Sequence, residues 1–287
     1  MSAFSAENFN ATGYDRFRPS YPDEFYQSLQ SYHNGNHNLL VDVGCGPGTA
    51  TFQLSEHLQF KRIVGTDLST TMINKAQDRL STASKNFANV SFRVSPGGEF
   101  SFFDQGSADM VTAAQCVHWF DFHHFQNEVW KVLAQHGTLA IWGYVDPIFL
   151  DYPELDAALL RLQYGDEQLG PYWEQPGRSI LRNLFDAFVI DEQKFEDIVE
   201  VRYTAQDVRS GRSFSSSPLK VCKVMNLQDF KNYIGTWSSY HNWKDKNPDK
   251  PDIRDHFFHE IFSSTKLSWQ TEIRVVWNTV YKLARKR

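Results

Sequence analysis

Apolar runs alternate with amphipathic stretches along the first half of the chain. Five short runs have the length and composition of buried strands, and they are Leu39–Val43, Arg62–Thr66, Val90–Val94, Ala108–Ala113 and Thr138–Tyr144. Helical patterns lie between them, including Thr70–Leu80 with Ser69 as its expected N-cap. This alternation predicts successive βαβ units, and therefore a mostly parallel sheet with helices on both faces.

The pattern changes after about Asp146. Helical and turn-rich segments follow, with a further strand predicted at Ile198–Thr204. Residues 227–241 carry apolar side chains at helical spacing, which predicts one amphipathic helix that ends at KDKNPDKPD. The β-branched run Ile273–Leu283 predicts a last strand. We find no repeat and no long linker, so one sheet domain with helical insertions is expected.

A glycine loop follows the first predicted strand in VDVGCGPGT, with Gly44, Gly46 and Gly48 at alternate positions. A dinucleotide fingerprint would place its third glycine where Thr49 stands, and a phosphate-binding loop would end in Gly-Lys-Ser/Thr. Asp67 ends the second strand, near the separation at which an acid binds ribose hydroxyls. The set fits a ligand with a ribose and no pyrophosphate, and Asp42 beside the loop suits a ligand amino group.

Several segments of the sequence resemble those of a known enzyme family. VDVGCGPGTAT followed by IVGTDLSTTMI is similar to the cofactor site of class I S-adenosylmethionine-dependent methyltransferases. RPSYP, AAQCVHWFD, IWGYVDP and GPYWEQPGR together resemble the trans-aconitate methyltransferase family in its fungal form, and the similarity runs over nearly the whole chain. The resemblance implies a Rossmann-like α/β fold: a mostly parallel seven-stranded sheet with an antiparallel C-terminal strand and helical cap insertions.

The resemblance also implies a division of the single domain 1–287. Residues 1–35 would form an N-terminal lid and 36–146 the cofactor-binding half. Residues 147–195 and 205–270 would form the helical substrate cap, and 271–287 the final strand.

Site residues follow from the same motifs. The residues expected to contact S-adenosylmethionine are Tyr14, Arg18, Asp42, Gly44, Gly46, Gly48, Asp67, Leu68, Glu99 and Gln115. Those expected to contact the acceptor are Arg18, Tyr21, His118, Trp119, Trp142, Trp173 and Arg178. Arg16 and Arg182 are the next candidates for the acceptor pocket.

The implied reaction forms the monomethyl ester of a small polycarboxylic acid such as trans-aconitate. A carboxylic acid has a pKa of about 4 in water, so the nucleophile is already ionised and no general base is required. Arginines should hold the non-reacting carboxylates, because pairing with the reacting one would lower its nucleophilicity. A loop arginine is also often solvated or paired with a nearby acid, here Asp15, Asp23 or Glu174.

Three alternatives stay open at this stage. The acceptor could be a related diacid, such as isopropylmalate or a xenobiotic. The protein could bind S-adenosylmethionine without turnover. A nicotinamide-dependent oxidoreductase is disfavoured by Thr49. Cys116, His118, His123 and His124 do not predict a metal site, because the expected turn at 119–122 scatters their directions.

Charge and composition limit the kinds of partner and the compartment that we expect. The net charge of −5 argues against nucleic acid as the main partner. The sequence has no apolar run of the length that a membrane span needs, and its N-terminal residues lack the features of a secretory signal. The three cysteines match no disulfide framework, which is typical of a reducing compartment. We expect a cytoplasmic monomer.

Overall fold

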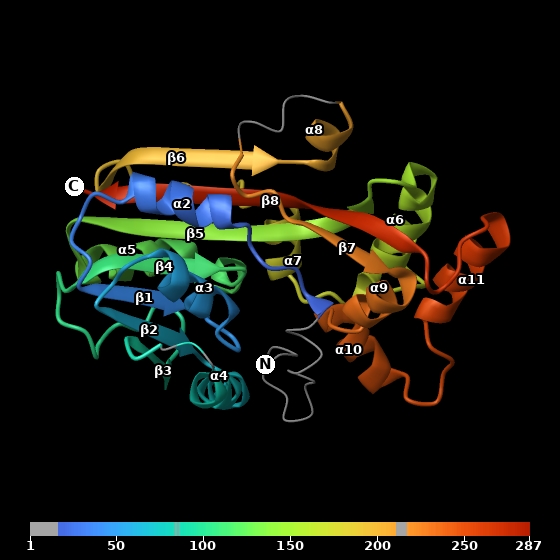
Figure 1. The fold of residues 1–287 in the computed structure, drawn as a ribbon, viewed down its shortest axis with the longest axis horizontal. Coiled ribbons are helices and arrows are strands. Elements are labelled where there is room, and N and C mark those ends of the chain that lie inside the picture. Colours follow the sequence, from blue (N-terminus) through green and yellow to red (C-terminus); the bar gives the residue numbers. More distant parts are fainter. Residues whose placement is uncertain (1–16, 84, 86, 211–216) are drawn as a thin grey trace.

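The structure is a computed structural model, and it describes residues 17–83, 85, 87–210 and 217–287. Figure 1 shows one large sheet with helices in front of it and behind it. The strands of the sheet are β1 (Leu39–Val43), β2 (Arg62–Asp67), β3 (Val90–Val94), β4 (Ala108–Ala114), β5 (Leu133–Phe149), β6 (Phe195–Tyr203), β7 (Cys222–Asn226) and β8 (Glu272–Lys286). Their order is β3-β2-β1-β4-β5-β8-β6, with β7 also paired to β8.

Parallel pairing joins β3, β2, β1, β4 and β5, whereas β8 runs antiparallel to β5, β6 and β7. The expected fold is confirmed: a mostly parallel sheet with one antiparallel strand at the C-terminus. Among the described residues the sheet has eight strands, however, and not seven. The additional strand is β7, which lies in the 205–270 segment expected to be helical.

Helices α2 (Asp23–Tyr32), α3 (Thr49–His57) and α4 (Thr70–Thr82) cover one face of the sheet. Their apolar side chains pack with those of alternate strand residues such as Leu40 and Met110. On the opposite face, α5 (Phe122–Val132) and α7 (Gly177–Arg182) pack on Val41 and Val111. Because both faces are covered, β1 is buried at every position.

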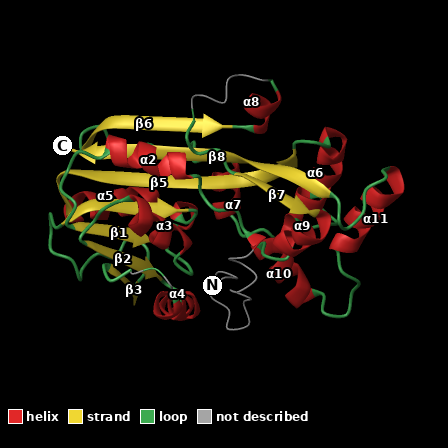
Figure 2. Ribbon diagram, viewed as in Figure 1, coloured by secondary structure: helices red, strands yellow, loops and turns green. Residues whose placement is uncertain are grey.

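The remaining helices gather where β5 and β8 extend beyond the parallel strands (Figure 2). They are α6 (Asp156–Tyr164), α8 (Ala205–Arg209), α9 (Leu227–Ile234), α10 (Ser238–Lys246) and α11 (Arg254–Ser264). Three short 3₁₀ turns complete the described elements: Val117–Trp119, Pro153–Leu155 and Gly170–Tyr172.

One feature of this helical region differs from the prediction. The single helix expected at 227–241 is two helices: α9 ends at Ile234 with Gly235 as its C-cap, and Trp237, with an extended backbone, is the N-cap of α10. The apolar spacing continues across the break, since Phe230, Ile234 and Trp237 are all buried.

Ser69 does cap α4 as expected, accepting a hydrogen bond from the Met72 N–H at 3.3 Å.

The lid predicted for residues 1–35 stays a prediction for its first part, because Tyr14 and Arg16 lie outside the described residues. Its second part is a layer of the fold, since α2 buries Phe25, Tyr26 and Leu29 almost completely. Along the described ranges, no helix combines the length and the apolarity that crossing a membrane requires.

Candidate active site

The glycine loop turns the chain from β1 into α3. Gly44 and Gly46 have φ values of +62° and +54°, a region that side-chain-bearing residues rarely adopt. A Cβ on Gly44 would lie 2.6 Å from the Cβ of Cys116, whereas a Cβ on Gly46 would meet no atom within 4 Å. Gly44 is therefore required by packing, and Gly46 leaves open space at the surface of the loop.

Asp67 ties this loop to the end of β2. One carboxylate oxygen accepts the Gly46 N–H at 2.9 Å and the other accepts the Ser69 N–H at 2.8 Å. Burial raises the pKa of the Asp67 carboxyl, and the two backbone N–H groups oppose that rise. Each oxygen keeps a further lone pair, so the carboxylate can still bind two hydroxyl groups of a ligand.

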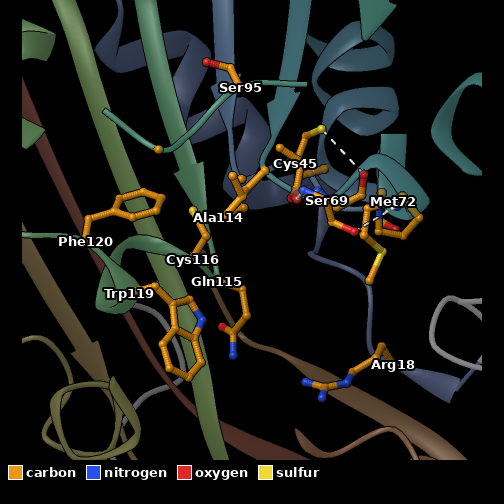
Figure 3. A pocket seen from close by; sticks show the side chains of 18 of the residues that line it. Arg18, Cys45, Ser69, Met72, Ser95, Ala114, Gln115, Cys116, Trp119 and Phe120 are labelled. Carbon is orange, nitrogen blue, oxygen red and sulfur yellow. Dashed lines mark hydrogen bonds between the residues drawn. The ribbon is translucent and has the colours of Figure 1, made fainter. Parts of the chain in front are cut away.

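A large cavity of about 490 Å³ opens beside the loop and Asp67. It lies at the carboxyl ends of β1, β2 and β4, where ligands of open α/β sheets bind. Figure 3 shows Trp119 and Phe120 on one side of this cavity, across from Ser69 and Met72. Its volume is within the range of pockets that enclose a small organic ligand.

A small cavity of about 50 Å³ adjoins the large one. Arg18, Gln115 and Trp119 line both cavities, so the two are neighbours. The other residues that line the small cavity are His118, Trp173, Glu174, Arg178, Leu181 and Ser238. Two arginines and one glutamate are therefore among the residues that line it.

Comparisons with known proteins show which proteins the chain resembles. Residues 41–141 match the family model described as a methyltransferase domain. The chain is 29% identical to the probable S-adenosylmethionine-dependent methyltransferase CRG1 of Saccharomyces cerevisiae, covering 100% of this chain and 99% of that protein. It is also 29% identical to methyltransferase pgmE of Aspergillus terreus over 48% of this chain and 42% of that one.

Solved structures agree with this fold. A protein of Anaeromyxobacter dehalogenans described as a type II methyltransferase superimposes with a TM-score of 0.70 at 22% identity, covering 93% of this chain and 97% of that one. A phosphoethanolamine N-methyltransferase of Haemonchus contortus, solved with S-adenosylhomocysteine, gives a TM-score of 0.51 at 15% identity and covers 96% and 56%. Residues 41–141 thus match a methyltransferase domain, and the fold of the chain is that of the methyltransferases on which it superimposes.

Most residues expected to contact S-adenosylmethionine line the large cavity. They are Arg18, Gly44, Gly46, Asp67, Leu68 and Gln115. Gly48 does not line the cavity but is the N-cap of α3. Glu99 does not line it either, because the loop after β3 presents Ser95 and Gly97 there instead. Tyr14 lies outside the described residues.

Asp42 is a clear departure from the expected contact. Its side chain is fully buried beneath the loop, and its two oxygens accept the hydroxyls of Thr51 at 2.6 Å and Thr112 at 2.7 Å. Asp42 thus joins β1 to α3 and β4 and does not reach a ligand amino group. Burial raises the pKa of its carboxyl to about 6, although both threonine hydroxyls act in the opposite direction.

The side chain of Gln115 is hydrogen-bonded to the backbone of Tyr144. The residue adopts φ +57°, and its carboxamide exchanges two hydrogen bonds with Tyr144, at 2.7 Å to the N–H and 2.8 Å to the carbonyl oxygen. This bracket fixes the end of β4 against β5 at the boundary between the two cavities. The carboxamide of Gln115 is therefore engaged by the Tyr144 backbone, and Gln115 lines both cavities at their boundary.

The residues expected at the acceptor are partly brought together. Arg18, His118, Trp119, Trp173 and Arg178 all line the small cavity, and Tyr21 lines the large one. Trp142 is the exception, since it is fully buried and packs edge-on against Tyr21. Tyr144, two residues further along the same strand, lines the large cavity in its place.

The two arginines of the small cavity are held by different partners. Arg18 donates from Nε and Nη2 to the hydroxyl and carbonyl oxygens of Thr236, both at 2.9 Å, and from Nη1 to the Tyr144 hydroxyl at 3.3 Å. Arg178 stacks 3.8 Å from the centre of the Trp173 ring and pairs with Asp146 at 2.8 Å. Asp146 was not among the acids that sequence reasoning considered for an arginine.

His118 is buried beside this charge. Its Nδ1 has no hydrogen-bond partner among the described residues, and its side chain is only 6% exposed. Burial, and to a lesser degree the charge of Arg178, lowers the pKa of the imidazole to about 3. The ring is therefore neutral at physiological pH and can take part in one hydrogen bond through each nitrogen.

Proposed function

We propose that the methyltransferase esterifies one carboxylate of a small polycarboxylic acid, with trans-aconitate as the acid to which its motifs point. The observation that carries this proposal is the small cavity, where Arg18 and Arg178 converge beside the large cavity. On a chain with a net charge of −5, two arginines at one cavity provide the local positive charge that a polyanion needs.

The large cavity fits S-adenosylmethionine through its donor set. Asp67 keeps one lone pair on each oxygen for ribose hydroxyls, and the open space at Gly46 allows close approach to the loop backbone. S-adenosylmethionine supplies the methyl group: a carboxylate oxygen bonds its carbon as the sulfur–carbon bond breaks, leaving the monomethyl ester and S-adenosylhomocysteine.

The residues at the acceptor side favour a nucleophile that is already ionised. His118, which lines the small cavity, has a pKa of about 3 and is a poor base at neutral pH. An amine or an alcohol would need a base to remove its proton, whereas a carboxylate needs none. The protein has only to orient the acceptor about 3–3.5 Å from the methyl group and exclude water.

Arg18 and Arg178 suit the non-reacting carboxylates. A guanidinium that pairs with the reacting oxygens would withdraw electron density from them, so it serves catalysis better at another carboxylate. Trp119, which lines both cavities and is 38% exposed, forms a wall between acceptor and donor. An aromatic face beside a sulfonium would add about 0.5–2 kcal/mol of attraction.

A panel of acceptors tests the proposal. Label transfer from S-adenosylmethionine is measured with trans-aconitate, isopropylmalate, citrate, a long-chain monoacid and an amine. We expect base-labile product from the short di- and triacids, and the most active acid identifies the acceptor. Label on the amine, or on the monoacid alone, would contradict the proposal. Tight cofactor binding without any labelled product would favour a binding protein.

A further inference from the structure

A β-bulge interrupts β5 at Asp146, which pairs with Arg178 of the small cavity. Pairing with β8 runs as far as Val145 opposite Asn278 and resumes at Pro147 opposite Trp277, so Asp146 has no partner in the ladder. Asp146 also adopts φ +46°, in the left-handed region. A bulge of this kind redirects a side chain, and bulges are frequent beside active sites.

The redirected carboxylate of Asp146 binds three side chains, one from α6 and two from α7. One oxygen accepts Nη2 of Arg178 at 2.8 Å and the hydroxyl of Tyr164, and the other accepts Nε of Arg182 at 3.2 Å. The Asp146 side chain is 17% exposed. Two guanidinium groups surround one carboxylate, so the cluster keeps a net positive formal charge.

Arg178 is restrained by hydrogen bonds along one edge of its guanidinium and by an aromatic ring against its face. Its Nε and Nη2 donate to the Tyr164 hydroxyl at 3.0 Å and 2.5 Å, and Nη2 also donates to Asp146. The Trp173 ring lies 3.8 Å below the guanidinium. Within the described ranges Nη1 forms no hydrogen bond, although Arg178 lines the small cavity. One nitrogen of a fixed guanidinium is thus left for a ligand.

We infer that Asp146 is a positioning residue for the acceptor: it holds Arg178 so that Nη1 meets a non-reacting carboxylate in the small cavity. The inference rests on the proposed function and extends it, because it explains how an arginine of the short helix α7 acquires a single orientation. A flexible arginine would lose rotamer entropy on binding the acceptor, and a restrained one has already lost it.

The opposite effect of Asp146 is physically possible, and it gives the inference a clear test. A carboxylate beside Arg178 also cancels part of the charge that attracts an anionic acceptor. If cancellation dominates, removal of the Asp146 charge tightens acceptor binding. If positioning dominates, the same removal weakens it.

Asp146→Asn separates the two effects. Asparagine tolerates the left-handed region, so the bulge is retained while the charge and one acceptor oxygen are lost. Tyr164→Phe removes a hydroxyl from the same cluster without changing charge. Asp151→Asn is the matched control, since Asp151 pairs with Arg274 on the surface near the end of the same strand.

The measurements are kcat and KM for the most active acid of the panel, the dissociation constant of S-adenosylhomocysteine, and Tm. In Asp146→Asn we expect KM to rise roughly 5–20-fold, with kcat and cofactor affinity within about twofold of wild type. Tyr164→Phe should raise KM in the same direction, and Asp151→Asn should leave it unchanged.

An unchanged or lower KM in Asp146→Asn would overturn the inference. So would a parallel loss of cofactor affinity and Tm, which marks a structural role. Wild-type turnover in the same experiment reports separately on the proposed function. A wild type that methylates no acid removes the function and the inference together, whereas an active wild type with an unaffected variant removes only the inference.

Discussion

Gly44→Ala and Gly46→Ala provide a paired test of how the glycine loop works. Both residues have positive φ, so an alanine at either costs about 1–2 kcal/mol of backbone strain. Only at Gly44 would the new methyl group also collide, at 2.6 Å from Cβ and 2.7 Å from Sγ of Cys116. Overpacking of this kind adds about 1–3 kcal/mol.

We therefore expect Gly44→Ala to lose about 2–5 kcal/mol of unfolding free energy without ligand, and Tm to fall on the order of 5–15 °C. Gly46→Ala should lose only the strain of about 1–2 kcal/mol. Its methyl group would instead occupy open space at a residue that lines the large cavity. The affinity of the Gly46→Ala variant for the cofactor should therefore fall at least about tenfold. This loss is a local effect of the methyl group and does not result from the loss of stability without ligand.

Thermal unfolding without ligand and calorimetric titration with S-adenosylhomocysteine measure the two quantities. The reasoning would be refuted if Gly46→Ala lost as much apo stability as Gly44→Ala. Wild-type cofactor affinity in Gly46→Ala would also refute it, because the open space would then not be the place where the ligand approaches the loop.

Three further predictions concern single side chains. Asp67→Ala should weaken cofactor binding by about 1–3 kcal/mol, since it removes the acceptor of the Gly46 N–H together with the proposed ribose contact; titration with S-adenosylhomocysteine measures this loss. Arg178→Ala should raise the acceptor KM roughly 10–100-fold through loss of a charge-assisted hydrogen bond, with cofactor affinity unchanged; initial-rate kinetics measure this change. Asp42→Asn should remove a dependence of stability on pH. The folded protein holds the Asp42 proton more tightly than the unfolded chain, so this carboxyl contributes stability below about pH 4 that is lost as pH rises through about 6. The loss amounts to about 3 kcal/mol, and the variant should gain that much relative to wild type between pH 4 and pH 7.5 in denaturant titrations.

Each of these three has a result that would contradict it. Unchanged cofactor affinity in Asp67→Ala would place the ribose elsewhere. Wild-type kinetics in Arg178→Ala would remove that arginine from the acceptor site, and Arg274→Ala, at an exposed ion pair, is the matched control. A constant difference in stability between wild type and Asp42→Asn across the pH range would mean that Asp42 is already ionised when buried.

The sequence predicted the strand–loop–helix unit well because its signals are local. The run from Leu39 to Val43, the glycines after it and Asp67 at the end of β2 follow from periodicity and spacing alone. The break in the 227–241 helix was missed because Gly235 and Thr236 lie inside a stripe whose apolar spacing continues through the turn.

The errors at the site have a tertiary origin. Asp42 precedes the loop by two residues, but the pleat of β1 points its side chain between α3 and β4 and away from the cavity. Trp142 and Tyr144 share one face of β5, and only the position nearer the strand end reaches the cavity. The ion pair of Arg178 joins residues 32 positions apart through a bulge that no local pattern indicated.

A crystal structure with S-adenosylhomocysteine and trans-aconitate would show directly whether the acid binds at the two arginines beside the methyl donor. We expect the ribose on Asp67, the methionine part along Gly44 to Gly46, and a non-reacting carboxylate at Arg18 and Arg178. A second carboxylate should face the sulfur, with room for a methyl group between them. An acid bound away from the two arginines, or with every carboxylate turned from the sulfur, would contradict the account.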